Sequence, residues 1–280
     1  MSNNLFLIPI IFFGLYFLLK DLKFLLRLID KDFNKPQSFH SVPILRIGGL
    51  LIFITTTITY MVYSKNFFLN NFFIWLILAN FLLGFLDDLK IVTSPFKKFM
   101  FFLIINFFII YCYQIKILNF DNIVLDSINN SGNIPAYLLV LISLFFCING
   151  SNLIDGFNGL LGIHSIIILS VLIFNFSYSE TLDFKIYLLI FLLSLMSFLI
   201  LNFPYSKIFL GDSGSLILGT VMAITIILAS NENKNISAYY FAILIYYVSF
   251  EVFFSVFRKI FQKKNPFKPD SEHLHMLLFN

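Results

Sequence analysis

The feature that most constrains this chain is a succession of long apolar runs that fills almost its whole length. A helix that spans a bilayer needs about 20 predominantly apolar residues, and hydrophobic residues make up 59% of the 280 positions. Charged residues account for only 12%, against roughly 25% in a soluble domain. Too few polar side chains remain to cover a core of this size. We therefore expect an integral membrane protein, and exclude a soluble enzyme, a disordered scaffold, a disulfide-stapled secreted module and a nucleic-acid binder.

The apolar runs predict an all-α, polytopic bundle of about nine transmembrane helices. Neither an internal repeat nor a long linker divides the sequence, so residues 1–280 are expected to form one membrane domain with a tail at 258–280. The expected helices cover 5–19, 47–63, 67–86, 99–115, 134–149, 159–176, 186–203, 214–230 and 236–257.

The distribution of lysine and arginine predicts the orientation of these helices, because cytoplasmic connections are enriched in both. Of the 19 such residues, 15 fall in alternate connections and the tail, and only Lys65, Lys116, Lys185 and Lys234 fall on the other side. The richer side comprises 20–46, 87–98, 150–158, 204–213 and 258–280. We therefore expect an extracytoplasmic N-terminus, catalytic loops on the cytoplasmic face, and a location in the cytoplasmic (inner) membrane.

Five polar clusters lie on this predicted cytoplasmic side, and the first two contain charges suited to phosphate chemistry. His40 and Arg46 precede a glycine pair and suit an anionic head group, although an arginine beside a membrane is common. Asp87 and Asp88 repel each other unless a cation lies beside them, and a solvated acid pair is the simpler alternative. Lys97 and Lys98 follow. They suit a lipid phosphate, or they anchor the helix by extending to the membrane surface.

The third and fourth clusters combine glycine with aspartate and asparagine. In NGSNLIDGFNG, residues 149–159, three glycines predict that the helix is interrupted, and irregular backbone at membrane depth lines a wet cavity. Asn152 and Asp155 in that segment suit a nucleotide or a metal–phosphate group. In LGDSGS, Asp212 is a candidate Mg²⁺ ligand, and the N–H groups that open the following helix are expected to face phosphate. A helix cap is the structural alternative.

The fifth cluster lies in the tail, where His273 and His275 suit a phosphate or sugar, or simply belong to a solvated end. The sequence shows no apolar run after them, so we expect the tail to be mobile without substrate and to reach over the Asp87/Asp212 surface. Within the apolar runs, His164 is interpreted as a core histidine. Glu251 is a functional candidate, because acids inside a membrane are costly to bury.

Together the clusters resemble, in order and spacing, the polyprenyl-phosphate N-acetylhexosamine-1-phosphate transferases (glycosyltransferase family 4). The resemblance is carried by HSVPILRIGGL, GFLDDLK, NGSNLIDGFNGLLG, NFPYSKIFLGDSGSLILG and NPFKPDSEHLH. The last of these is nearer to the undecaprenyl-phosphate GlcNAc-1-phosphate transferases than to phospho-MurNAc-pentapeptide translocase. The chain departs from the family pattern in having Gln37-Ser38, Glu251, Ser271 and Met276 where other residues are usual.

The resemblance implies transfer of a sugar-1-phosphate from a UDP-sugar to undecaprenyl or another polyprenyl phosphate, with release of UMP. This would be the first membrane step of a cell-envelope polysaccharide. The implied cofactor is Mg²⁺, with Mn²⁺ as an alternative, and a homodimer is left open. The implied site consists of Asp87 and Asp88 as catalytic residues, Asp212 and Asp155 as metal ligands, and Asn152, Lys97, Lys98, His40, Arg46, His273 and His275 as substrate-binding residues.

Other function classes fit the sequence less well. A transporter would place charges near the middle of several spans, yet only Glu251 and His164 lie inside apolar runs. A catalytically weakened relative that binds polyprenyl phosphate stays open because of the departures from the family pattern. A phosphotransferase acting on CDP-alcohols would gather its aspartates in one segment, and this chain spreads them over three.

Overall fold

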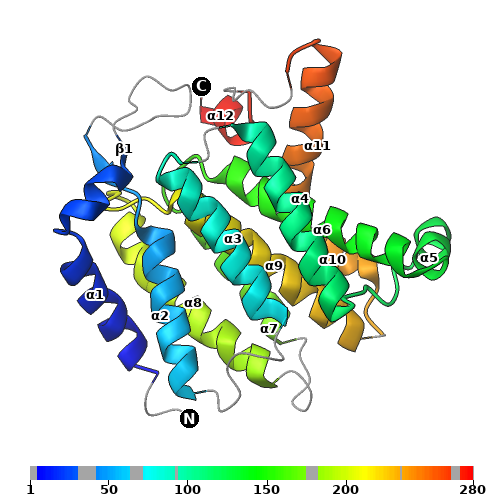
Figure 1. Ribbon diagram of the computed structural model, residues 1–280, viewed down its shortest axis with the longest axis horizontal. Coiled ribbons are helices and arrows are strands. Elements are labelled where there is room, and N and C mark those ends of the chain that lie inside the picture. The colour runs from blue at the N-terminus through cyan, green and yellow to red at the C-terminus, as the bar shows by residue number, and fades with distance from the viewer. Residues whose placement is uncertain are drawn as a thin grey trace.

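The computed structural model is a bundle of helices with one small two-stranded sheet, and it describes residues 5–30, 42–63, 72–91, 94–174, 182–233, 235–265 and 272–279 (Figure 1). The longer helices are α1 (Leu7–Leu19), α2 (Gly48–Tyr63), α3 (Phe72–Asp88), α4 (Pro95–Tyr113), α6 (Asn133–Ile154), α7 (Leu160–Ile173), α8 (Leu182–Asn202), α9 (Gly211–Glu232) and α11 (Tyr246–Phe261). The shorter elements are η2 (Lys23–Leu28), β1 (Ile29–Asp30), β2 (Ile44–Leu45), α5 (Ile123–Asn130), α10 (Ala238–Leu244) and α12 (Leu274–Phe279).

Each apolar run predicted to be helical contains a helix, so the all-α prediction is confirmed. The last run is divided, because α10 and α11 meet at an angle of 72°. Among the described residues, four helices (α4, α6, α8 and α9) are long and apolar enough to cross a membrane, or five if α10 and α11 count as one span. The apolar helices α1, α2 and α7 are shorter. The protein is thus a multi-pass membrane protein, and the nine spans and their orientation stay predictions.

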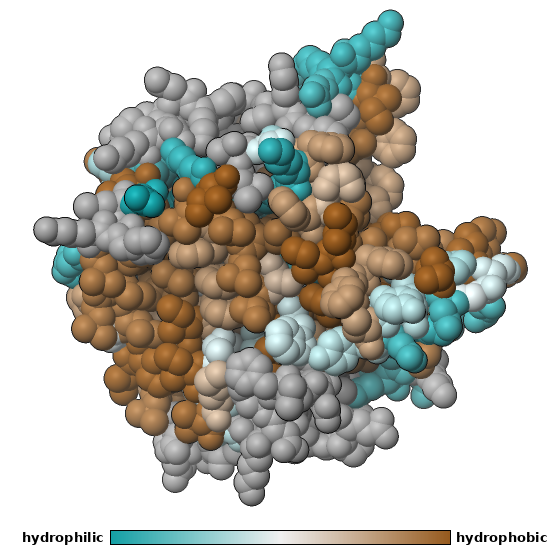
Figure 2. Space-filling view, viewed as in Figure 1, coloured by the Kyte–Doolittle hydropathy of each residue, from teal (hydrophilic) through white to brown (hydrophobic). Residues whose placement is uncertain are grey.

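The outer surface of the bundle is apolar, as a membrane environment requires. Figure 2 shows hydrophobic side chains over the flank of the bundle, and hydrophilic ones mainly along the top of the view and around α5 on the right. On α4, for example, Phe101, Ile104 and Phe108 are all exposed. Figure 1 shows the beginning of α1 and the short helix α12 at opposite ends of the bundle.

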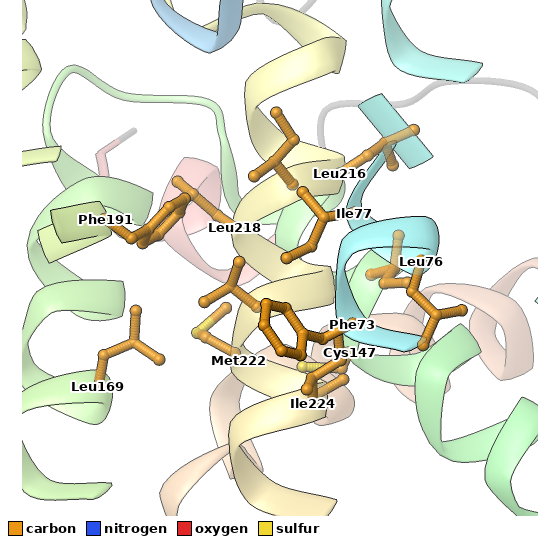
Figure 3. Packing of buried hydrophobic residues seen from close by; sticks show 14 of the residues in the cluster. Phe73, Leu76, Ile77, Cys147, Leu169, Phe191, Leu216, Leu218, Met222 and Ile224 are labelled. Carbon is orange, nitrogen blue, oxygen red and sulfur yellow. The ribbon is translucent and has the colours of Figure 1, made fainter. Parts of the chain in front are cut away.

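Helix α9 is the centre of the bundle. It packs against α2, α3, α6 and α7, and 83% of the residues in its most apolar 18-residue stretch are buried. Figure 3 shows its side chains among those of the surrounding helices, with Leu218, Met222 and Ile224 near Phe73, Ile77 and Phe191. A helix that is apolar on every side can be enclosed by other helices or face lipid, and the packing of α9 shows that it is enclosed.

Glycines let two neighbouring helices touch the backbone of α9 at its N-terminal end. A Cβ atom added to Gly84 of α3 would lie 2.5 Å from the main-chain oxygen of Asp212. A Cβ added to Gly49 of α2 would clash with the main-chain nitrogen of Gly214. The glycines in these two motifs therefore serve close packing around the first turn of α9.

The predicted interruption within residues 149–159 is confirmed at 155–159, between α6 and α7, but it is wrong at 149–154, because α6 continues to Ile154. Its polar side chains find acceptors one turn earlier: Ser151 Oγ and Asn149 Nδ2 donate to main-chain oxygens at 2.8 and 3.0 Å. A Cβ at Gly150 would clash with the main-chain oxygen of Val248 in α11. Gly150 thus allows two helices to pack closely, and here close packing outweighs the low helix propensity of glycine.

Candidate functional site

Three charged side chains from three helices meet where α3 ends, α4 begins and α9 begins. Lys98 Nζ donates to Asp87 Oδ2 at 2.5 Å and to Asp212 Oδ2 at 2.7 Å. The side chains of Asp87 and Asp212 keep 25% and 31% of their surface exposed, and that of Lys98 keeps 22%. The acid pair and the LGDSGS segment, more than a hundred residues apart, therefore form one partly open site, as the sequence predicted.

The second aspartate of the pair points elsewhere. Asp88 Oδ1 accepts a hydrogen bond from the main-chain nitrogen of Asp212, and its Oδ2 accepts one from that of Ser213, both at 2.9 Å. The first N–H groups of a helix have no partner within the helix. The prediction that these groups face a phosphate is wrong at Asp212 and Ser213, because a carboxylate buried to 3% exposure already binds them.

Gly211, the first residue of α9, has a conformation that only glycine adopts easily. Its φ is 77°, in the left-handed region that side chains disfavour. A Cβ there would also lie 2.8 Å from Asp88 Oδ2. A glycine directly before Asp212 is therefore required twice, by the turn and by the neighbouring carboxylate.

The third polar cluster approaches the same place from α6. Asn152 Nδ2 donates to Ser215 Oγ at 2.9 Å, and Ser215 Oγ donates to the main-chain oxygen of Asp212 at 3.2 Å. At the end of α6, burial raises the pKa of Asp155 to about 7, and the charges of Asp212 and Asp88 add to this effect.

Arg46 is held beside the site by Asp30, a residue that the sequence did not indicate. Arg46 Nη2 and Nε lie 2.5 and 3.1 Å from Asp30 Oδ2. Burial opposes the charge of Arg46, but the hydrogen bond and charge of Asp30, together with the charges of Asp212 and Asp88, outweigh it, so its pKa is raised. The two residues meet because β1 and β2 pair antiparallel, with Ile29 opposite Leu45. The residues around Asp30 give no local signal that predicts its contact with Arg46.

The strand β2 also connects Arg46 to the start of α9. Phe209 N donates to Leu45 O at 2.8 Å, and Gly49 N donates to Leu210 O at 2.8 Å. The first and fourth polar clusters are therefore joined through their backbones. His40, the other candidate of the first cluster, lies outside the described residues.

The histidine motif is docked on α11. His273 Nδ1 lies 3.1 Å from Glu251 Oε2, and Leu274 N donates to Glu251 Oε1 at 2.9 Å. Both Glu251 and His273 are 1% exposed. The chain then continues as α12. Residues 272–279 are thus docked on α11 and include a short helix that the sequence did not predict, because the buried acid of α11 binds donors from the tail. Mobility of the tail without substrate stays a prediction.

The other candidate residues are less constrained. Lys97 is exposed on the first turn of α4. The backbone of His275 lies in α12, and its side chain is outside what the structure describes. Inside α7, His164 packs edge-on against Tyr247 with ring centroids 5.7 Å apart. This contact is compatible with a histidine that belongs to the bundle core. Substrate contact by Lys97, His273 and His275 stays a prediction.

The carboxylates fit a Mg²⁺ ion bound together with a phosphorylated substrate better than an ion enclosed by protein. Among the described residues, no three His, Cys, Asp or Glu side chains are grouped so as to hold a metal. Asp87 and Asp212, however, already converge on one positive charge, the ammonium of Lys98. Mg²⁺ commonly takes one or two carboxylates and completes its shell with water and substrate phosphates. Two converging, partly exposed carboxylates meet that requirement.

Comparison with known families identifies one that includes this site. Residues 70–230, more than half of the chain, match the sequence model described as glycosyl transferase family 4. The matched range contains Asp87, Asp88, Lys98, Asn152, Asp155 and Asp212. His40, Arg46, Glu251 and His273 lie outside it.

Individual relatives carry related names. An undecaprenyl-phosphate alpha-N-acetylglucosaminyl 1-phosphate transferase of Thermotoga maritima is 27% identical over 247 residues, which cover 88% of this chain and 71% of that protein. A probable undecaprenyl-phosphate N-acetylglucosaminyl 1-phosphate transferase of Bacillus subtilis is 33% identical over 142 residues, covering 50% of this chain and 39% of that protein. A phospho-N-acetylmuramoyl-pentapeptide-transferase of Dictyoglomus turgidum is 30% identical over 187 residues, covering 63% and 57% respectively.

Proposed function

The chain belongs to glycosyl transferase family 4, and on that premise we propose that it transfers a sugar-1-phosphate from a UDP-sugar to undecaprenyl or another polyprenyl phosphate. The observation that carries this proposal is the convergence of Asp87, Lys98 and Asp212 inside the family-matched region. The names of the relatives favour UDP-N-acetylglucosamine as the donor. The reaction would begin the assembly of a cell-envelope polysaccharide.

The reaction makes few covalent demands on the protein. An oxygen of the lipid phosphate attacks the β-phosphorus of the UDP-sugar, the bond from that phosphorus to the bridging oxygen breaks, and UMP leaves. The lipid phosphate is itself the nucleophile, so a protein nucleophile is not needed. Catalysis of phosphoryl transfer is mainly positioning and stabilisation of charge. A compact set of charges from separate helices is suited to that task.

Asp87 and Asp212 are the residues that would hold Mg²⁺ or Mn²⁺, with Asp155 at the edge of the site. When bound, the ion would neutralise the diphosphate and stabilise charge on the departing phosphate. Asp87 and Asp212 bring two negative charges together from different helices, so they offer this ion a site only if their positions are fixed.

Lys98 keeps the two carboxylates together and offers a further contact. Its ammonium has three donors, and two of them bind Asp87 and Asp212. We assign the third to an oxygen of the substrate diphosphate. Arginine is not equivalent here, because its planar fork cannot reproduce the three directions of an ammonium group.

The proposed location follows from where the polar side chains lie. The site is formed at the ends of α3, α4 and α9, where a lipid phosphate in the membrane can meet a water-soluble nucleotide sugar. The lysine and arginine distribution supports the cytoplasmic face of the inner membrane for this end. A homodimer stays open, and nothing in the site calls for nucleic acid.

The test is a transfer assay with the full chain in nanodiscs. Purified protein is incubated with undecaprenyl phosphate, Mg²⁺ and one of several labelled UDP-sugars, and labelled lipid and UMP are measured. We expect equal amounts of both products, with UDP-N-acetylglucosamine among the best donors, and transfer by Asp212→Asn about 1,000-fold slower. Polyprenyl-phosphate binding without product from any donor would instead support a catalytically silent relative.

A further inference from the structure

The two adjacent aspartates at the end of α3 have different surroundings. The Asp87 side chain is 25% exposed and faces Lys98 and Asp212. Asp88 is only 3% exposed. A group that takes a proton from a substrate, or that binds a metal shared with a substrate, must reach the space that the substrate occupies. By exposure, Asp87 can therefore contact substrate or metal, whereas Asp88 cannot.

The oxygens of Asp88 are both used within the protein. Oδ1 binds the N–H of Asp212 and Oδ2 binds the N–H of Ser213. A carboxylate is especially favourable at the N-terminus of a helix, where the N–H groups and the helix dipole are positive. Asp88 is thus a helix cap supplied by another helix, and its first bond is made to the backbone of Asp212 itself.

The face of α3 that carries Asp88 is shaped to the first turn of α9. Gly84 lies one turn before Asp88, hence on the same face. A Cβ on Gly84 would lie 2.5 Å from both the Asp212 oxygen and Ser213 Cα. On the other side of the contact, a Cβ on Gly211 would lie 2.8 Å from Asp88 Oδ2. Helix α9 therefore cannot shift at this point without losing the Asp88 bonds or meeting the backbone of α3.

We propose that Asp88 is a positioning residue: it fixes the first turn of α9, and thereby holds the Asp212 carboxylate opposite Asp87. Asp87 supplies a ligand to the open site, while Asp88 locks the helix that supplies the other ligand. The part of this inference that concerns catalysis rests on the proposed function. The part that concerns α9 does not.

Two replacements of Asp88 distinguish a role as a helix cap from a role as a catalytic group. Asp88→Asn keeps a side-chain oxygen that accepts one of the two N–H groups, whereas Asp88→Ala keeps none. A positioning role predicts graded effects, with kcat reduced about 10-fold by asparagine and about 100-fold by alanine, since small misplacements cost on this scale. The KM for the UDP-sugar changes less. A proton acceptor or metal ligand predicts equal losses, because neither residue replaces a carboxylate.

Hydrogen–deuterium exchange of the full-length protein without substrate gives a readout that does not depend on turnover. The peptide that covers residues 206–216 reports on the N–H groups of Asp212 and Ser213. We expect faster exchange in Asp88→Ala, a smaller increase in Asp88→Asn, and wild-type exchange in Asp87→Asn, the matched control beside it. Thermal unfolding of each variant is measured as well, to show that the variant is folded before its exchange is compared.

Unchanged exchange in folded Asp88→Ala would overturn the inference, as would equal kcat losses in the two Asp88 variants. If the alanine variant does not fold, the exchange of Asp88→Asn against wild type decides in the same way. If the exchange is graded but the wild-type protein transfers no sugar phosphate, the helix cap is supported and the proposed function is contradicted.

Discussion

Two helices of this protein begin at a buried carboxylate that another helix supplies, and they differ in how much of the structure depends on that contact. The first turn of the 22-residue helix α9 is capped by Asp88, which accepts hydrogen bonds from two successive main-chain N–H groups. The start of the six-residue helix α12 is capped by Glu251, which contacts one main-chain N–H and one histidine ring. The chemistry is the same, because a buried acid and an unpaired helix N-terminus satisfy each other.

The difference lies in what surrounds each contact. At α9 the backbones of α2 and α3 approach without intervening side chains, so the carboxylate is one part of a rigid junction. At α12 the other contacts are made by side chains: Met276 is buried, and Glu272 pairs with Arg258 and Lys264. We infer that the α9 junction is a permanent part of the fold, and that the α12 junction attaches a peripheral element. The following predictions test this distinction, beginning with the largest effect.

Asp212→Asn should reduce kcat by about 1,000-fold, because an amide is a weak ligand for a hard cation and a carboxylate bound to such an ion contributes several kcal/mol. The α9 junction itself should remain, since Asp88 binds the main chain of Asp212 and not its side chain. Steady-state kinetics and thermal unfolding of the same preparations test both parts. Near-normal turnover at low Mg²⁺ would contradict the assignment of Asp212.

Gly84→Ala should destabilise the protein by about 2 kcal/mol and reduce transfer, because overpacking a close contact typically costs 1–3 kcal/mol. The added Cβ would lie 2.5 Å from main-chain atoms of α9. Gly14→Ala in α1 is the matched control, since a Cβ there meets nothing within 4 Å. The measurement is the thermal unfolding midpoint of each variant in detergent. Equal midpoints for the two alanine variants would mean that the junction yields easily.

Glu251→Ala should release the tail while leaving the start of α9 unchanged. Removal of the acceptor leaves His273 and the N–H of Leu274 without their carboxylate partner. We expect hydrogen exchange in residues 272–279 to rise about tenfold, as for an element that opens locally, and the KM for the UDP-sugar to rise more than that for polyprenyl phosphate. Increased exchange at residues 206–216 as well would show that the two junctions are coupled.

Glu272→Gln should have the smallest effect. Its contacts with Arg258 and Lys264, at 3.3 and 3.4 Å, involve a carboxylate side chain that is 38% exposed. Exposed ion pairs contribute little to stability and are screened by salt. Tail exchange should therefore change by less than about threefold, and less still at high salt. A change as large as that of Glu251→Ala would mean that the surface contacts, and not the buried acid, hold the tail.

Much of the architecture follows from the sequence because its signals are local. Long apolar runs locate membrane helices, whatever they later pack against. The α9 segment was predicted from its own residues, as was the candidate role of Asp212 beside two glycines. Predictions failed where packing overrides a local preference. Gly150 suggested a break, yet α6 continues there because the glycine permits contact with α11.

The sequence by itself determined that this is a helical membrane protein, because hydrophobicity is carried by neighbouring residues, and it predicted that the acidic and basic motifs lie on one side. Only the tertiary structure decided which aspartate of the pair faces the site, which acid holds Arg46, and where the histidine motif docks. Each answer depends on a partner distant in the chain: Asp212 for Asp88, Asp30 for Arg46, Glu251 for His273. Neighbouring side chains on a helix point in different directions. Residues as alike as Asp87 and Asp88 therefore acquire different roles only when other helices pack against them.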